Sequence, residues 1–124
     1  MTASADCELC TPQGVLVENE LGYAGLERNS LSLGHVVVVP RRHVADFFAL
    51  TPAEQAALGK LLNQARAIIQ DRHSPDGYNI GVNVGRAAGQ SRMHVHVHLI
   101  PRYVGDVADP SGGVRCVLAR KAPG

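Results

Sequence analysis

Two periodicities of apolar and polar residues run along the chain, and each predicts a different kind of secondary structure. Apolar residues at positions 58, 61, 62, 65, 68 and 69 recur at the spacing of one helix face. Just before them, Thr51 offers a capping hydroxyl, Pro52 suits the first helical position and Glu54 completes a capping box. We therefore expect one long helix that begins at Thr51 and ends at the turn signals of residues 74–77.

Short apolar and β-branched runs predict strands on both sides of this helix. They cover residues 15–17, 23–27, 35–39, 78–84 and 93–100. The resulting order is three strands, the helix and two more strands. This order favours an α+β fold in which the helix covers an antiparallel sheet.

The length of the chain, 124 residues, is that of one ordinary domain. The sequence has neither an internal repeat nor a low-complexity segment, so we interpret residues 1–124 as a single domain. Within it, residues 1–14 form an N-terminal segment that carries a Cys-x-x-Cys pair, and residues 105–124 form an irregular tail.

Composition narrows the classes of function. The net charge is +1, no Lys/Arg-rich run is present and aromatic residues make up only 4%, so we expect no nucleic-acid partner. No apolar run reaches the roughly 18 residues of a spanning helix, so we expect no membrane partner. Residues 1–6 lack the basic start and apolar core of a signal peptide, which favours a cytoplasmic location, where disulfides are rare.

The last predicted strand contains His94, His96 and His98 in alternation with apolar residues. Because strand side chains alternate between faces, we expect all three imidazoles on one face and the apolar residues against the helix. Imidazole titrates near neutral pH and can act as nucleophile, proton donor or anion ligand. Two alternatives stay open: polar residues on a solvated face, and an all-histidine metal centre, although His98 lies far along the strand for that.

A glycine-rich turn, residues 85–92, leads directly into the histidine run. It combines a flexible backbone with amide, hydroxyl and guanidinium donors. Such a turn can surround an anion with N–H groups and add side-chain donors to phosphate oxygens. Alone it is a weak signal, but its position before three histidines strengthens the interpretation of a phosphate site.

Residues 89–102, which read GQSRMHVHVHLIPR, resemble the signature of the histidine triad (HIT) family of nucleotidyl hydrolases and transferases. The resemblance extends to residues 34–40 and to Asn83, and it covers roughly residues 7–104. It implies a HIT-like α+β fold, in which one long helix and a short helix pack on an antiparallel sheet. Family members usually form two-fold dimers, so the resemblance also implies a homodimer.

The resemblance implies a role for each histidine. His96 would attack the α-phosphorus and become transiently nucleotidylated, since imidazole is both a competent nucleophile and a good leaving group. His98 would bind the α-phosphate oxygens, His35 would help to fix the phosphate, and His94 would orient His96. Substrate contacts would fall on Glu27, Asn83, Gly89, Gln90 and Ser91.

Glu27 matches an acidic position that binds the ribose hydroxyls in relatives, where aspartate is usual. A carboxylate suits a vicinal diol because it accepts two hydrogen bonds. The alternative for Glu27 is an ordinary surface glutamate.

Cys7 and Cys10 have the spacing of half a zinc knuckle or of a redox pair, and the redox interpretation requires a βαβ context that is missing. Here the chain resembles bacterial triad proteins and the galactose-1-phosphate uridylyltransferases. That resemblance implies a closed, structural Zn²⁺ site of Cys7, Cys10, His43 and His94.

Residues 101–107 and 109–115 resemble the tail of bacterial triad proteins described as dinucleoside polyphosphate hydrolases. We therefore expect a hydrolase that cleaves a dinucleoside polyphosphate or a similar conjugate, with an adenine nucleotide as the expected substrate. Three alternatives remain: an adenosine 5′-phosphoramidase, a phosphorylase, and a nucleotide-binding module without turnover.

Overall fold

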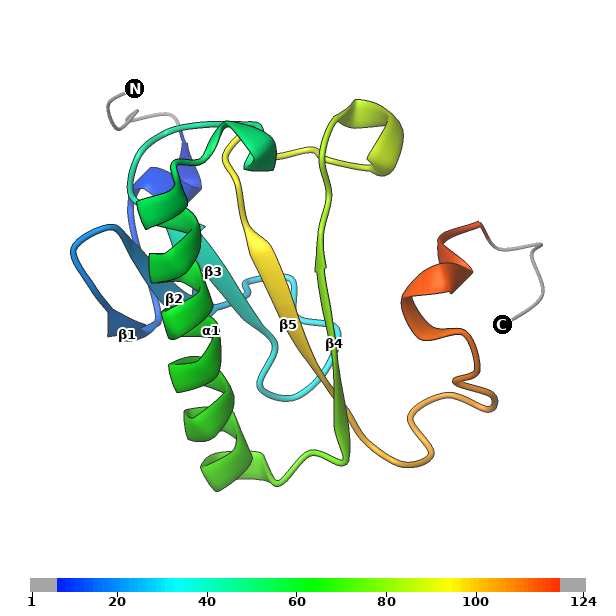
Figure 1. Cartoon of the computed structure of the whole chain (residues 1–124). Helices are drawn as coiled ribbons and strands as arrows, with labels where there is room; N and C mark the ends of the chain where they lie inside the picture. The colour runs from blue at the N-terminus through cyan, green and yellow to red at the C-terminus, as the bar shows by residue number, and fades with distance from the viewer. Residues whose placement is uncertain (1–6, 119–124) are drawn as a thin grey trace.

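The computed structural model describes residues 7–118 and contains a five-stranded antiparallel sheet in the order β1-β2-β3-β5-β4. Its elements in chain order are η1 (Glu8–Cys10), β1 (Val15–Glu18), β2 (Gly22–Leu26), β3 (Val36–Pro40), η2 (Phe47–Ala49), α1 (Pro52–His73), β4 (Gly77–Val82), η3 (Arg86–Ala88), β5 (Val97–Arg102) and η4 (Gly113–Val117). Helix α1 crosses one face of the sheet (Figure 1). The predicted α+β fold is confirmed, and the short helices of the described part are 3-10 helices, marked η.

Helix α1 begins where the capping sequence predicts. The Thr51 hydroxyl accepts a hydrogen bond from the Glu54 N–H at 3.0 Å, and the Glu54 carboxylate accepts one from the Thr51 N–H at 2.9 Å. Arg42 binds both oxygens of the same carboxylate, at 2.8 and 2.9 Å. At the other end, Ser74 adopts a left-handed conformation with φ 49°, which closes the helix.

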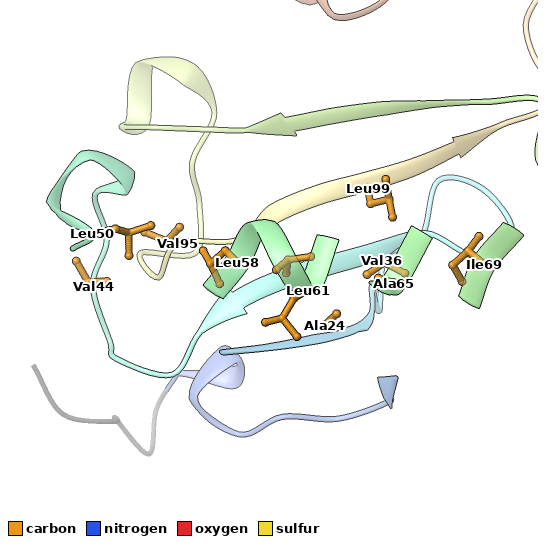
Figure 2. Packing of buried hydrophobic residues seen from close by; sticks show 11 residues of the cluster. Ala24, Val36, Val44, Leu50, Leu58, Leu61, Ala65, Ile69, Val95 and Leu99 are labelled. Atoms are coloured by element: carbon orange, nitrogen blue, oxygen red, sulfur yellow. The ribbon is translucent and has the colours of Figure 1, made fainter. Parts of the chain in front are cut away.

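The main core lies between α1 and the sheet. Figure 2 shows its side chains, which come from the helix, from β2, β3 and β5, and from the loops at one end. Gly22 of β2 allows the close approach of these layers, because a Cβ there would lie 2.7 Å from the Val39 carbonyl oxygen and 2.9 Å from Leu58. The buried members are Ala24, Val36, Val38, Val44, Leu50, Leu58, Leu61, Ala65, Ile69, Val95 and Leu99.

Strand β3 is buried on both faces. Val36 and Val38 contact the main core, whereas Val37 and Val39 belong to a second cluster with Leu9 and Tyr23. The second cluster therefore lies on the face of the sheet that α1 does not cover. His98 lies opposite Val37 in the β3–β5 register, so the fold presents it on that same face.

The last strand begins later than predicted, and β4 ends at Val82 rather than at residue 84. Strand β5 begins at Val97 rather than at residue 93, so His94 and His96 precede it. The physical reason is local pairing with the loop after β3: the Val95 N–H donates to the Val44 carbonyl at 2.7 Å. Of the three histidines, only His98 therefore lies within a regular strand. Among the described residues, no helix is both long and apolar enough to cross a membrane.

Candidate active site and metal centre

Cys7, Cys10, His43 and His94 form a cluster on the uncovered side of the sheet, and we call it the Cys/His cluster. Their potential ligand atoms all lie within 4.8 Å of one another. His94 Nδ1 lies 3.4 Å from both thiol sulfurs, and His43 Nδ1 lies 3.2 Å from Cys10 Sγ. Helix η1 turns the chain so that both cysteines face inward, and the loop after β3 supplies His43.

The Cys/His cluster fits a tetrahedral metal. Zn–S bonds of about 2.3 Å and Zn–N bonds of about 2.0 Å place neighbouring sulfur and nitrogen ligands roughly 3.5 Å apart, close to the separations found here. The Nε2 atom of His94 lies 2.7 Å from the Pro40 carbonyl oxygen and donates to it. Its Nδ1 is therefore unprotonated and faces the thiols. A hydrogen bond from the other ring nitrogen to a carbonyl, as His94 makes to Pro40, is the outer contact that metal-bound histidines usually make.

His96 is held in the opposite tautomer. Its Nδ1 lies 2.8 Å from the His94 carbonyl oxygen, an acceptor, so this nitrogen carries the proton. The other nitrogen, Nε2, then keeps its lone pair. Because His96 is only 6% exposed, little water competes for that lone pair.

His98 and His35 form a hydrogen-bonded pair beside His96. His35 Nε2 lies 2.9 Å from His98 Nδ1, and His35 Nδ1 accepts from the Leu31 N–H at 3.0 Å. Since His35 Nδ1 is an acceptor, the proton lies on Nε2 and is donated to His98. His98 must then carry its own proton on Nε2, which makes that nitrogen a donor. The ring centroids of His96 and His98 are 5.1 Å apart.

Burial keeps these histidines neutral. It lowers the pKa of His98 to about 4, and the neighbouring rings of His96 and His35 add to the effect. Burial likewise lowers the pKa of His96 and of His35. The arrangement thus offers, near pH 7, a neutral imidazole with a free lone pair next to a neutral imidazole that donates a proton.

Glu27 follows β2 on the sheet face that α1 leaves uncovered, and Arg92 binds its carboxylate. Arg92 Nη2 lies 2.6 Å from Glu27 Oε2, and Nη1 lies 3.3 Å from Oε1. Burial would raise the pKa of Glu27, but these hydrogen bonds and the guanidinium charge hold it below its usual value. Because the residue is 7% exposed, the surface-glutamate alternative is wrong.

Glu27, His35 and His98 also lie close enough to hold a metal ion. Their donors are already engaged, however, in the His35–His98 hydrogen bond and in the Glu27–Arg92 ion pair. We therefore assign the metal-binding geometry to the Cys/His cluster alone among the described residues.

The glycine-rich turn is confirmed, and its residues take different roles. Gly85 and Gly89 have φ 88° and 93°, which side chains other than glycine rarely adopt. Gln90 is 4% exposed and braces the turn, because its oxygen accepts from the Gly85 N–H at 2.9 Å and its amide donates to the Ala45 carbonyl at 2.9 Å. Asn83 and Ser91 are exposed at either end of the turn.

Arg92 is the site residue that the sequence did not single out. It appeared there only as one of several donors in the turn, and no spacing rule connects it with Glu27. No sequence signal marks it, and the structure shows a second carboxylate partner: Glu8, between the two cysteines, also binds Arg92, at 2.9 Å.

Comparisons with known proteins identify the family of the chain. The model of the HIT domain family matches residues 9–105, and the chain belongs to this family. Among solved structures, a HIT family protein from Bacillus anthracis has a TM-score of 0.77 at 31% identity, covering 83% of this chain and 77% of that one. A zinc-bound histidine triad protein from Mycobacterium smegmatis has a TM-score of 0.74 at 28% identity, covering 84% and 80%.

Two relatives in sequence are named as enzymes. A protein of Mycobacterium tuberculosis named AP-4-A phosphorylase is 38% identical over 101 residues, which are 80% of this chain and 52% of that protein. A protein of Schizosaccharomyces pombe named bis(5'-nucleosyl)-tetraphosphatase [asymmetrical] is 35% identical over 95 residues, 77% of this chain and 52% of that protein. The chain thus spans about half the length of these curated relatives.

Proposed function

We propose that this protein cleaves dinucleoside polyphosphates or related nucleotide conjugates at the α-phosphate, through a nucleotidyl intermediate on His96. The observation that carries the proposal is the pair of opposite tautomers at His96 and His98. One ring presents a lone pair, and its neighbour presents an N–H, with ring centroids 5.1 Å apart. Family membership and the names of the two relatives support it.

The reaction then divides into two displacements. His96 Nε2 forms a bond to the α-phosphorus while the bond from that phosphorus to the bridging oxygen breaks, and the polyphosphate leaves with the electron pair. His98 Nε2–H donates to a non-bridging oxygen on which charge develops, and His35 holds His98 in the donating tautomer. Water next attacks the same phosphorus, the N–P bond breaks, and the mononucleotide leaves with one proton released.

The other expected site residues complete this proposal. Glu27 accepts the ribose hydroxyls, while Asn83, Gly89 and Ser91 contact the phosphate from the turn that Gln90 braces. Zn²⁺ is the ion we propose for Cys7, Cys10, His43 and His94. With all four positions taken by protein ligands, the ion would cross-link the N-terminal segment to the residues around His96. It would not hold a reacting water.

A phosphorylase is a second candidate, and the name of the Mycobacterium tuberculosis relative favours it. The same nucleotidyl-His96 would then be attacked by inorganic phosphate instead of water. The products separate the two candidates: diadenosine tetraphosphate gives AMP and ATP with water, but ADP and ATP with phosphate.

The decisive assay identifies products by mass spectrometry, with diadenosine tetraphosphate in the presence and absence of inorganic phosphate. A parallel tube contains an adenosine phosphoramidate, and the His96→Ala variant serves as the blank. We expect the wild type, but not His96→Ala, to form AMP and ATP from diadenosine tetraphosphate. ADP that appears only with phosphate would favour the phosphorylase. Turnover of the phosphoramidate alone would favour the phosphoramidase, and inertness in every tube would contradict enzymatic activity.

We also propose a homodimer with pairing across α1 and the edge strand β4. An apolar hollow of about 330 Å³ lies between these elements, with Leu58, Leu62, Ile80 and Val82 in its lining. Ile80 of β4 is 51% exposed. Sedimentation velocity tests this directly: Ile80→Glu should shift a wild-type dimer toward the monomer, and a monomeric wild type would contradict it.

A further inference from the structure

Arg92 lies between two carboxylates next to the histidines. Its guanidinium contacts both oxygens of Glu27, and its Nη1 also lies 2.9 Å from Glu8. The Glu27 side chain is 4% exposed and that of Arg92 is 23% exposed, so the pair is largely shielded from water. Each Glu27 oxygen therefore already accepts a hydrogen bond from the guanidinium.

The space beside the Glu27–Arg92 ion pair is too small for a nucleoside. The hollow that Glu8, Tyr23, Glu27, Val37 and Arg92 help to line has a volume of only about 20 Å³. Pockets that bind small molecules measure roughly 300–1,000 Å³. A ribose can therefore reach Glu27 only after the Arg92 side chain has moved away.

Arg92 is placed to find another anion when it moves. The same Glu27 oxygen that lies 2.6 Å from Arg92 lies 3.9 Å from His98 Nδ1, so the guanidinium lies near the ring of His98. A guanidinium binds phosphate oxygens in a fork, as it binds carboxylates. A phosphate at His98 would thus offer Arg92 the same kind of partner that Glu27 offers now.

We propose that Arg92 exchanges partners when substrate binds. Its guanidinium leaves Glu27 for a phosphate of the nucleotide, and the ribose hydroxyls take the acceptor atoms that it vacates. The exchange rests on the proposed function, because it assumes a nucleotide phosphate at His98. The exchange couples recognition of the two halves of the substrate. A whole nucleotide gives both Glu27 and Arg92 a new partner, whereas a nucleoside or a phosphate alone breaks the ion pair and replaces only one partner.

The alternative is a permanent ion pair that serves only the fold. The chain offers a matched example in Arg42, which binds both oxygens of the buried Glu54 at the start of α1. None of the hydrogen bonds that Arg42 makes reaches the triad histidines. Arg42→Met therefore measures what the loss of a buried Arg–Glu pair alone does.

The test uses two probes that each carry half of the substrate: adenosine and inorganic pyrophosphate. Binding of each is measured by NMR titration of the zinc-loaded wild type, Arg92→Met and Glu27→Gln. Exchange predicts effects of opposite sign. In Arg92→Met, pyrophosphate affinity falls about tenfold or more, while adenosine affinity rises because Glu27 is free. In Glu27→Gln, adenosine affinity falls while pyrophosphate affinity rises, since Arg92 loses its competitor.

Two controls accompany these variants. Arg42→Met should leave the ratio of the two affinities unchanged within about twofold, because Arg42 takes no part in the proposed exchange. Arg92→Lys keeps the charge without the fork and replaces Arg92→Met if that variant does not fold, with a smaller loss of pyrophosphate affinity expected.

Parallel losses of both probes in Arg92→Met and Glu27→Gln would overturn the exchange and leave a structural ion pair. If the wild type still cleaves diadenosine tetraphosphate in that case, the proposed function stands. A wild type that neither binds the probes nor cleaves the tetraphosphate would overturn both proposals.

Discussion

The Cys/His cluster and the His96–His98 pair are neighbours that use the same residue type in opposite ways. In His94 a carbonyl oxygen, that of Pro40, covers Nε2 and leaves Nδ1 facing the thiols. In His96 a carbonyl oxygen, that of His94, covers Nδ1 and leaves Nε2 with the lone pair. The difference teaches that the backbone carbonyl bound by each ring decides which nitrogen is left free, and residues two apart can therefore take the separate roles that we propose in metal binding and in catalysis.

Removing the nucleophile should affect the catalytic side alone. We expect His96→Ala to lower kcat/KM for diadenosine tetraphosphate by at least about a thousandfold, because no other group can form the intermediate. Zinc content, measured by atomic emission, should match that of the wild type. A variant that keeps wild-type turnover would remove His96 from its role.

Removing a ligand of the Cys/His cluster should affect metal binding and stability more than turnover. We expect Cys10→Ser to lower the zinc content and to reduce Tm by at least about 10 °C, because bound metal stabilises only the folded state. Turnover well below the new Tm should fall less than tenfold, since Cys10 does not touch the reacting atoms. Calorimetry and metal analysis check the first part, and an unchanged Tm in a zinc-free wild type would contradict a structural ion.

The pH dependence of kcat/KM distinguishes buried histidines from solvent-exposed imidazoles. The pKa of His98 lies at about 4 because of burial, and protonation at Nδ1 would break its hydrogen bond from His35. The neutral state that we propose as active is thus present at high pH and is lost as the pH falls toward 4. We expect kcat/KM to change less than about twofold between pH 8 and 6. A half-maximal value near pH 6.5 would contradict this, and zinc content measured at each pH controls for loss of metal.

The smallest effect should come from a residue outside both regions. Thr51→Ala removes one half of the capping box of α1, and we expect a loss of about 1 kcal/mol in the free energy of unfolding. Urea denaturation measures this loss. Zinc content and turnover should stay at wild-type values, and a change in either would mean that α1 is coupled to the site.

The sequence was sufficient for the fold where local signals and tertiary packing agree. The capping residues set the start of α1, and the apolar run of β3 marked a strand buried on both faces. The prediction failed at the start of β5, because alternation of histidine and valine indicates a strand but does not reveal that Val44 competes for the backbone of Val95. Long-range hydrogen bonds of this kind leave no periodic signal.

The candidate site follows the same rule. Residues grouped in one motif, such as His94, His96 and His98, were found from the sequence, and the Cys/His cluster followed from a family resemblance. The tautomers were not predictable, because they depend on which carbonyl lies next to each ring. Nor was the partner of Glu27, since Arg92 is 65 positions away and an arginine in a turn is usually solvated.

The central claim is a covalent nucleotide on His96, and trapping it is the most direct test. Wild-type protein is mixed with diadenosine tetraphosphate, quenched in alkali within the first turnover and digested for mass spectrometry. The account predicts one adenylyl group on the peptide that contains His96, absent from His96→Ala. Products that accumulate with no adduct at any time, or an adduct on a different residue, would contradict it.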